Sequence, residues 1–342
     1  MESLGEFTRK EIFTQTIAWQ NAIHEVESIA GKIQNFNIGN FDQVIFTGCG
    51  STYYLSLAAA SLFQNELGVI CRAIPGGELL MNPGSVYSGS NNLLVAISRS
   101  GSTTETLQAV EQFKKHKAGS VVCITNYDDE PLPKMADLPI VITEGQETSV
   151  AQTRSFSSMY VAATTLAMIS SGKPEFVKKM HELPEIGQAV INKNHDYVKQ
   201  IGENLDIDRI YILGSGLRYG LACEANLKMK EMTLTHTEPF YFLEFRHGPK
   251  SMVNENALVI GMLSESGRNL EERVLKEMQE IGGRTLSIAE SAADITFESG
   301  LPENIRNVLY LPVLQVMAYY RSLKKGLNPD SPKNLSKVVV LN

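Results

Sequence analysis

Residues 44–62 read VIFTGCGSTYYLSLAAASL, and residues 210–228 read IYILGSGLRYGLACEANLK. In both stretches a short run rich in β-branched residues stops at a glycine, and a helical stretch follows. Aligning the two places Gly48 on Gly214, so the copies lie 166 residues apart. Because the distance is far longer than the period of a solenoid repeat, we infer a duplicated domain.

A second pair of motifs lies at the same distance. LLVAISRSGS, from Leu93, matches VIGMLSESGR, from Val259. The apolar runs in the first copy are nearly continuous, which is typical of strands covered on both faces. These predicted strands are 44–47, 93–97, 121–125 and 140–143. Alternation with helices predicts an α/β fold of two tandem domains, each a doubly wound, mainly parallel sheet flanked by helices.

The rest of the chain is assigned around these two copies. Apolar residues at helical spacing between 8 and 35 predict an additional helix that packs on one half. The expected organisation is an N-terminal helical segment 1–36, a first domain 37–172, a connecting helical segment 173–206, a second domain 207–325 and a tail 326–342.

Composition excludes several classes of protein. With 342 residues, 43% of them hydrophobic, the chain can build a large core, which excludes a disordered protein. A net charge of −7 argues against nucleic-acid or membrane partners. The four cysteines form no C-x-x-C pair, and neither a secretory signal nor an 18-residue apolar run is present. We therefore expect a cytoplasmic protein with reduced cysteines and without a metal site.

Neither glycine-rich loop fits a nucleotide-binding motif. In GCGSTYY the third glycine of a dinucleotide fingerprint is replaced by Tyr53, and Tyr219 takes the same place in the second copy. The chain also lacks the Gly-Lys-Ser/Thr of a P-loop. Nicotinamide, flavin and P-loop nucleotide binding are therefore not expected, and no cofactor is predicted.

The loop SRSGSTTET suits a small anion. Ser98, Arg99, Ser100 and Thr103 follow a predicted buried strand and precede a helix. Hydroxyls and free N–H groups at a helix N-terminus favour a phosphate, although an ordinary Ser/Thr cap would use one or two of the same hydroxyls. The duplicate loop SESGRN has Glu265 in place of the arginine, which should repel phosphate. One phosphate site per chain is therefore expected.

Two further groups of residues are candidates for chemistry. Glu224, Lys228 and Glu231 lie on one face of the helix after GSGLRYG. They could form a solvated salt-bridge ladder, or Glu231 could be a base whose charge Lys228 adjusts. His247 precedes Gly-Pro, so a rigid turn should present its ring, although a lone histidine is more often structural. Nothing in the composition distinguishes Lys337 from a solvated tail lysine.

Six motifs together resemble the sugar isomerase (SIS) family. They are GCGSTYY, SRSGSTTET, ETSVAQTRSF, LKMKE, FRHGP and PKNLSK, and they occur in the family's order. The likeness extends from about residue 44 to 340 and is greatest to the isomerase half of glucosamine-6-phosphate synthase and its stand-alone deaminase, isomerase and deglycase relatives. The glutaminase domain of the synthase has no counterpart here, so glutamine-dependent amination is not expected.

The resemblance implies roles for individual residues. The phosphate-binding loop implies Ser98, Arg99, Ser100 and Thr103, with Thr52 near the sugar. The catalytic roles fall on three residues: Glu231 would move a proton between C1 and C2, His247 would assist ring opening from a neighbouring subunit of a homodimer, and Lys337 would reach the substrate and can form a Schiff base.

Two positions depart from the synthase pattern. Arg99 stands where the synthase has glutamine, and Gln152 stands where it has serine. Both should line the site, so the amino or acyl part of the substrate is expected to differ. The main hypothesis is an isomerase/deaminase for an amino-sugar 6-phosphate. A deglycase for a sugar-amino acid 6-phosphate and a non-catalytic sugar-phosphate sensor are the alternatives.

Overall fold

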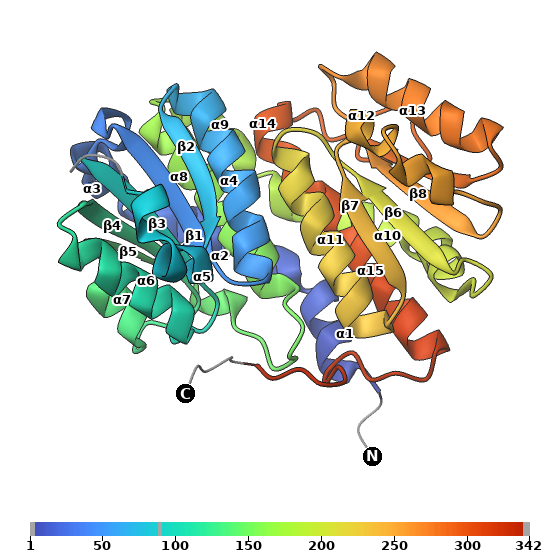
Figure 1. Cartoon of the computed structure of the whole chain (residues 1–342), viewed down its shortest axis with the longest axis horizontal. Helices are drawn as coiled ribbons and strands as arrows, with labels where there is room; N and C mark the ends of the chain where they lie inside the picture. Colours follow the sequence, from blue (N-terminus) through green and yellow to red (C-terminus); the bar gives the residue numbers. More distant parts are fainter. Residues whose placement is uncertain (1–3, 88–90, 338–342) are drawn as a thin grey trace. The chain divides into compact units, whose positions relative to one another are not determined.

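The computed structural model describes residues 4–87 and 91–337. Within these residues it confirms the predicted α/β class, with two five-stranded parallel sheets that are each flanked by helices (Figure 1). The chain divides into two compact units, named here after their strands. Of the described residues, the β1–β5 unit holds 14–87, 91–147, 152–184 and 336–337, and the β6–β10 unit holds 4–13, 148–151 and 185–335.

The β1–β5 unit is a doubly wound sheet with strand order β2-β1-β3-β4-β5. Helices α2, α4 and α8 pack together on one face, and α5, α6 and α7 lie on the other. Helix α8 is buried along nearly its whole length. The elements of this unit are β1 (Gln43–Gly48), β2 (Ile70–Pro75), β3 (Asn92–Ser98), β4 (Gly119–Thr125), β5 (Leu138–Val141), α2 (Gln15–Ser28), α3 (Ala30–Phe36), α4 (Ser51–Leu67), α5 (Gly76–Met81), α6 (Thr104–Lys115), α7 (Pro131–Met135), α8 (Arg154–Ser170) and α9 (Pro174–Met180).

The β6–β10 unit repeats this plan with strand order β10-β9-β8-β6-β7. Helices α11 and α15 pack against each other, and α11 covers β6 and β7, while α12 and α13 pack together and α13 contacts β8 and β9. The elements are β6 (Arg209–Leu213), β7 (His236–Phe240), β8 (Ala257–Met262), β9 (Arg284–Ala289), β10 (Ile295–Thr296), α1 (Glu6–Phe13), α10 (Leu183–Glu203), α11 (Leu217–Thr233), α12 (Phe242–Phe245), α13 (Arg268–Glu280), α14 (Glu303–Arg306) and α15 (Tyr310–Lys324).

The duplication is visible in the backbone of the first loop of each unit. Gly50 and Gly216 both have φ of 58°, a left-handed conformation that glycine adopts without steric cost. At Gly48 an added Cβ would lie 2.5 Å from the hydroxyl of Thr52, so the helix approaches the strand too closely for any side chain. Each turn leads into a helix of 17 residues, α4 in one unit and α11 in the other.

The N-terminal segment differs from its prediction, whereas the connecting segment is helical, as expected. The N-terminal segment forms three helices rather than one, with α1 in the β6–β10 unit and α2 and α3 in the β1–β5 unit. The connecting segment forms two helices, α9 and α10. In the N-terminal segment the apolar residues keep their helical spacing across the boundaries at Thr14 and Ile29. The spacing alone therefore could not show where one helix ends and the next begins.

Edge strands account for what the sequence pattern missed. Strand β2 alternates exposed and partly buried residues, and β7 contains Pro239, which is tolerated at an edge. Each is the strand at one end of its sheet. They therefore lack the continuous apolar run that identified the central strands.

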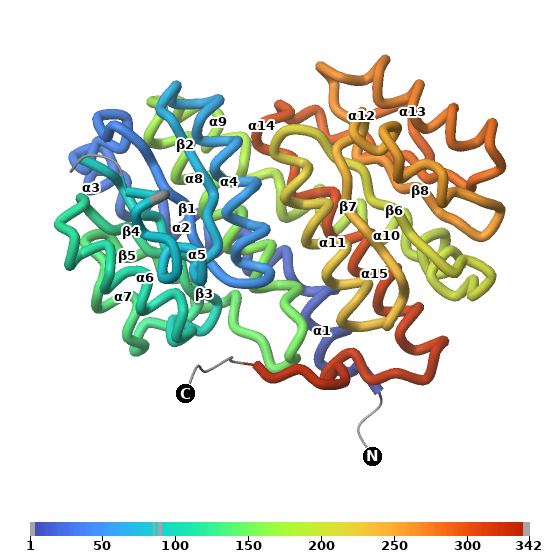
Figure 2. The backbone as a smooth tube through the Cα atoms, viewed as in Figure 1, coloured from blue at the N-terminus to red at the C-terminus, as the bar shows by residue number. Residues whose placement is uncertain are grey.

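The segment after α15 returns past α1 within the β6–β10 unit (Figure 2). The carboxylate of Asp330 accepts hydrogen bonds from the backbone N–H and the hydroxyl of Thr8, both at 2.7 Å. A carboxylate in this position also complements the positive end of the α1 dipole. These bonds fix the start of the tail that leads to Lys337.

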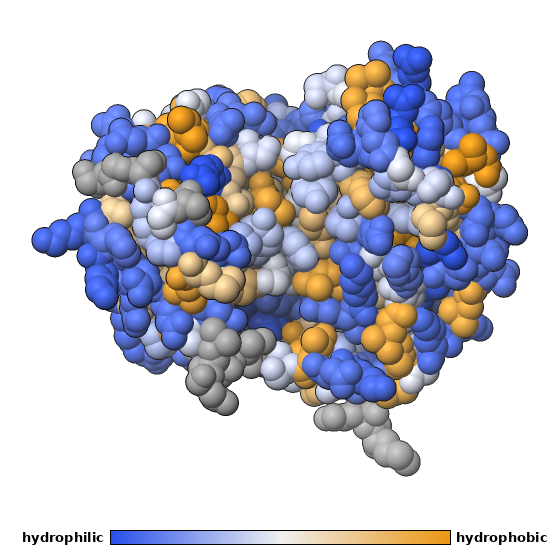
Figure 3. Space-filling view, in the orientation of Figure 1, coloured by the Kyte–Doolittle hydropathy of each residue, from blue (hydrophilic) through white to orange (hydrophobic). Residues whose placement is uncertain are grey.

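The surface is mainly hydrophilic on the face shown in Figure 3, with apolar residues in separate small patches. In the part of the chain that the structure describes, no helix combines the length and the apolar character needed to span a membrane.

Candidate active site

The loop after β3 carries the predicted phosphate-binding residues in the β1–β5 unit. The hydroxyls of Ser98 and Thr103 lie 3.1 Å apart, and Ser98 also accepts the N–H of Gly101 at 3.1 Å. Ser100 accepts the N–H of Ser102 at 3.2 Å. Gly101 has φ of 68°, which turns the chain so that α6 begins only at Thr104. The loop thus gathers three predicted residues at the N-terminus of a 12-residue helix, a favourable environment for an anion.

Thr52 lies in the neighbouring loop and organises it. Its hydroxyl accepts the N–H of Cys49 at 2.9 Å and donates to the carbonyl of Cys49 at 3.0 Å. The residue is buried. Its hydroxyl therefore closes the turn between β1 and α4, a role that the sequence analysis had not assigned to it.

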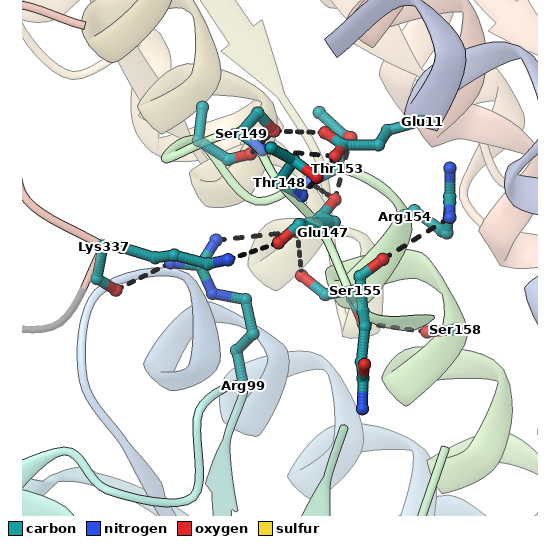
Figure 4. A network of polar contacts seen from close by, with 12 residues as sticks. Glu11, Arg99, Glu147, Thr148, Ser149, Thr153, Arg154, Ser155, Ser158 and Lys337 are labelled. Carbon is teal, nitrogen blue, oxygen red and sulfur yellow. Dashed lines mark hydrogen bonds and ion pairs between the residues drawn. The ribbon is translucent and has the colours of Figure 1, made fainter. Parts of the chain in front are cut away.

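Arg99 is directed toward the C-terminal tail and toward Glu147 (Figure 4). Its Nη2 donates to the carbonyl oxygen of Lys337 at 2.7 Å, and its Nη1 lies 3.6 Å from Oε2 of Glu147. The ammonium of Lys337 donates to the backbone carbonyl of Glu147. The structure thus brings Arg99 and Lys337 together, although 238 positions separate them in the sequence.

Glu147 is the buried centre of this group. It accepts the N–H of Thr153 at 2.7 Å, the Thr153 hydroxyl at 2.9 Å and the Ser155 hydroxyl at 2.5 Å. Its side chain is fully buried. These hydrogen bonds fix the carboxylate at the start of α8, so it offers Arg99 a rigid partner.

Gln152 lies just before α8 and is half-buried. Its amide oxygen is buried, and no hydrogen-bond partner for it is found among the described residues. A buried polar atom of this kind usually has a partner, which can be a ligand or a water.

Helix α11 of the β6–β10 unit holds the Glu-Lys-Glu stripe. Lys228 Nζ lies 2.5 Å from Oε2 of Glu231 and 3.3 Å from Oε1 of Glu224. The side chains of Lys228 and Glu224 are 2% and 1% exposed, and that of Glu231 is 19% exposed. The solvated-ladder interpretation is therefore wrong. A buried ammonium needs compensating charge, and the two carboxylates provide it.

His247 occupies an exposed turn between α12 and a short 3₁₀ helix that starts at Pro249. Its N–H donates to the carbonyl of Glu244 at 3.0 Å, and Gly248 follows with φ of 116°. Phe242 and Phe245 of α12 are buried in the core of the unit, which anchors the turn. The histidine ring is thus presented at the surface of a well-anchored turn.

The duplicate loop after β8 is filled by a residue of its own helix. Glu271, which is buried, accepts the N–H of Ser264 at 2.5 Å and its hydroxyl at 3.0 Å. Burial raises the pKa of this carboxyl, partly offset by the hydrogen bonds from Ser264 and the charge of Arg218. In the same loop Glu265 pairs with the buried Arg306 at 2.6 Å. The N–H and hydroxyl of Ser264 and the guanidinium of Arg306 are therefore already bound to carboxylates within the unit.

The structure therefore places the predicted residues in two groups. Thr52, Ser98, Arg99, Ser100, Thr103, Gln152 and Lys337 belong to the β1–β5 unit, and Lys228, Glu231 and His247 belong to the β6–β10 unit. Sequence reasoning assigned no role to Glu147 or Glu271. For Glu147 a signal existed, since it opens the motif ETSVAQTRSF between a strand and a Ser-rich helix start.

The thiols and potential metal ligands add little to the site. All four cysteines are free, and burial raises the pKa of Cys71, Cys123 and Cys223 to about 12. Among residues 4–87 and 91–337, no cluster of three His, Cys, Asp or Glu side chains could hold a metal ion.

Comparison with known proteins identifies relatives along the whole chain. Glutamine–fructose-6-phosphate aminotransferase of Sulfurisphaera tokodaii is 31% identical over 345 residues, which cover 99% of this chain and 57% of the relative. The enzyme of the same name from Methanothermobacter thermautotrophicus is 26% identical, with 98% and 57% coverage. The chain thus spans less than three-fifths of the length of these relatives.

Solved structures extend the comparison. Glucosamine-6-phosphate deaminase of Thermotoga maritima is 28% identical, with a TM-score of 0.77 and coverage of 94% of this chain and 100% of that one. Tagatose-6-phosphate ketose/aldose isomerase of Escherichia coli shares the fold, with a TM-score of 0.85, 24% identity and coverage of 97% and 96%. The model of the SIS domain matches residues 38–169 and 205–312. The chain belongs to the SIS domain family.

Proposed function

We propose that the chain is a phosphosugar isomerase/deaminase that acts on an amino-sugar 6-phosphate. The observation that supports this most directly is the buried Lys228, held between the carboxylates of Glu224 and Glu231. Such an arrangement fixes the Glu231 carboxylate and leaves it the most exposed member of the three, as a group that exchanges protons with a substrate must be. The 28% identical deaminase, covered over its full length, supports the same class of reaction.

The phosphate is assigned to the loop after β3. Ser98, Ser100 and Thr103 offer hydroxyls there, and the first turn of α6 adds backbone N–H groups and the positive end of its dipole. Arg99 flanks these residues, and Thr52 shapes the adjacent turn. Because these donors act locally, the loop can bind a single phosphate although the whole chain carries a net charge of −7.

Glu231 is the proposed base. After ring opening, it would remove the C2 proton of the open-chain aldose, giving an enolamine, and the proton would then be delivered to C1. The resulting imine at C2 takes up one water and releases the amine, leaving a ketose 6-phosphate. Glu231 carries the proton between the two transfers, and Lys228, whose Nζ lies 2.5 Å from it, would stabilise the carboxylate that exists before the first transfer and is restored by the second.

Ring opening is assigned to His247, with the chain acting as a homodimer in which this residue serves the neighbouring subunit. Its exposed turn supports this assignment. Tyr241 and Leu243, close in sequence, are each 44% exposed, so apolar surface for a protein contact flanks the histidine. Lys337 is proposed as the tail residue that reaches the substrate.

The test is turnover of glucosamine 6-phosphate in deuterated water, followed by mass spectrometry and ammonia detection. The wild type should release ammonia and fructose 6-phosphate with deuterium at C1. Glu231→Gln should lower kcat by about 100-fold or more, because the base is lost. Glu255→Gln is the matched control, since Glu255 is exposed and distant in sequence from the stripe. Unchanged turnover of the Glu231 variant would rule out this base.

A deglycase acting on a sugar-amino acid 6-phosphate is the second candidate. The buried amide oxygen of Gln152, without a partner among the described residues, favours it because this atom could accept a hydrogen bond from a larger polar substituent. A panel of fructosamine 6-phosphates should then release amino acids faster than glucosamine 6-phosphate releases ammonia. Gln152→Ser should lower only the amino-acid reaction.

A further inference from the structure

The side chain of Arg99 starts between two proposed phosphate ligands, Ser98 and Ser100, yet its guanidinium contacts other groups. Nη2 donates to the Lys337 carbonyl at 2.7 Å, and Nη1 faces the Glu147 carboxylate at 3.6 Å. Figure 4 shows the side chain extending from the β3 loop to these two partners. The arginine thus connects the loop to the C-terminal tail.

Burial makes this connection specific. The side chain of Arg99 is 5% exposed and that of Glu147 is fully buried, so the pair is shielded from solvent. Glu147 itself is fixed by Thr153 and Ser155. A planar guanidinium can hold a carboxylate and a carbonyl at once, whereas a lysine ammonium or a glutamine amide cannot reproduce this geometry and charge.

Two contacts hold the tail at this point. Arg99 binds the main chain of Lys337, and the ammonium of Lys337 donates to the Glu147 carbonyl. Lys337 is otherwise an exposed residue in an irregular segment. Arg99 is thus the side chain that binds the main-chain carbonyl of Lys337.

We propose that Arg99 is a positioning residue that anchors the C-terminal tail, through the carbonyl of Lys337, beside the phosphate loop, rather than a ligand of the phosphate. Its kinetic consequence rests on the proposed function, in which Lys337 reaches the substrate. The anchoring itself is independent of the reaction.

Limited trypsin digestion tests the anchoring without any substrate. To cleave after Lys337, trypsin must bind the carbonyl oxygen of Lys337 in its own active site, and Arg99 holds this same oxygen. Arg99→Gln should accelerate loss of residues 338–342, seen by intact-mass spectrometry, by about tenfold, because one charged hydrogen bond is removed. Cleavage after Lys333 is the internal control and should keep its rate. An unchanged rate at Lys337 would overturn the proposal.

Binding and turnover separate the two roles of Arg99. Glucitol 6-phosphate, which has no carbonyl to react, is the binding probe, measured by calorimetry. A positioning role predicts a Kd within about twofold of wild type and a kcat about tenfold lower for Arg99→Gln, the loss expected for one charged hydrogen bond. A large rise in Kd with unchanged kcat would make Arg99 a phosphate ligand and overturn the proposal.

Two further variants keep the result interpretable. Arg99→Lys preserves the charge and should show an intermediate increase in cleavage after Lys337, which covers the case that the glutamine variant does not fold. Arg268→Gln changes the arginine of the duplicate loop and should leave the cleavage, the Kd and kcat unchanged. If the wild type turns over no phosphosugar while Arg99→Gln still exposes Lys337 to trypsin, the proposed function fails and the anchoring stands.

Discussion

The loop after β3 and the loop after β8 are copies of one motif, S-x-S-G, with different internal bonding. In the first, Gly101 has φ of 68° and α6 starts at Thr104. In the second, Gly267 has φ of −100° and α13 starts at Arg268, two positions earlier in the matched numbering. The longer helix places Glu271 where its carboxylate takes both donors of Ser264.

The matching residue in the first loop shows that the side chain alone does not decide this difference. Glu105 corresponds to Glu271 at the same 166-residue distance. In the first loop, however, the Ser98 hydroxyl pairs with Thr103, which lies outside the helix. The two loops thus differ in the conformation of one glycine and, by two residues, in where the following helix begins. The first loop is suited to an anion, whereas the second is filled by the carboxylate of its own helix.

Removing hydroxyls from both loops gives the largest expected contrast. The double variant Ser98→Ala/Thr103→Val should weaken glucitol 6-phosphate binding by about 100-fold, because each hydrogen bond to a charged group contributes about 1.5–3 kcal/mol. Ser264→Ala should leave the affinity within about twofold. Calorimetric titration measures both, and comparable weakening by Ser264→Ala would contradict the assignment of a single phosphate site.

Removing the matched carboxylates gives a smaller effect, on stability. Glu271→Ala should lower the free energy of unfolding by about 1–3 kcal/mol, because the buried N–H and hydroxyl of Ser264 lose their acceptor. Glu105→Ala should lower the free energy of unfolding by less, because Glu105 is only half-buried. Urea denaturation compares the two, and equal losses would show that the two loops do not differ in this respect.

The pH dependence of stability should carry the smallest signal. Burial raises the pKa of Glu271 above its ordinary value, so the folded state binds this proton more tightly than the unfolded state does. The contribution of this group to stability therefore falls as pH rises through the ordinary carboxyl range toward the raised pKa. Glu271→Gln should remove this decline, seen as a flatter curve of Tm against pH. A curve with the wild-type slope would show that other groups cause it.

The extent of prediction from sequence follows from how local each signal is. Central strands β1, β3, β4, β6 and β8 have continuous apolar runs, and most of them were identified. Edge strands β2 and β7 lack such runs and were missed. For the site, residue types and spacing led to the β3 loop and to the α11 stripe. Whether that stripe was exposed could not be read from spacing, since Lys228 is buried by α11 packing that involves distant elements.

The sequence by itself revealed the duplication. Glycine recurs at 48 and 214 because at both positions the following helix lies too close to the strand for a side chain. It also determined the residue types available for binding phosphate and for moving protons. Only the tertiary structure decided which of them meet. Arg99 and Lys337 are 238 positions apart, and the choice between Ser98 bonding to Thr103 and Ser264 bonding to Glu271 depends on where a helix begins. Such contacts arise from packing of the whole chain, which no local pattern records.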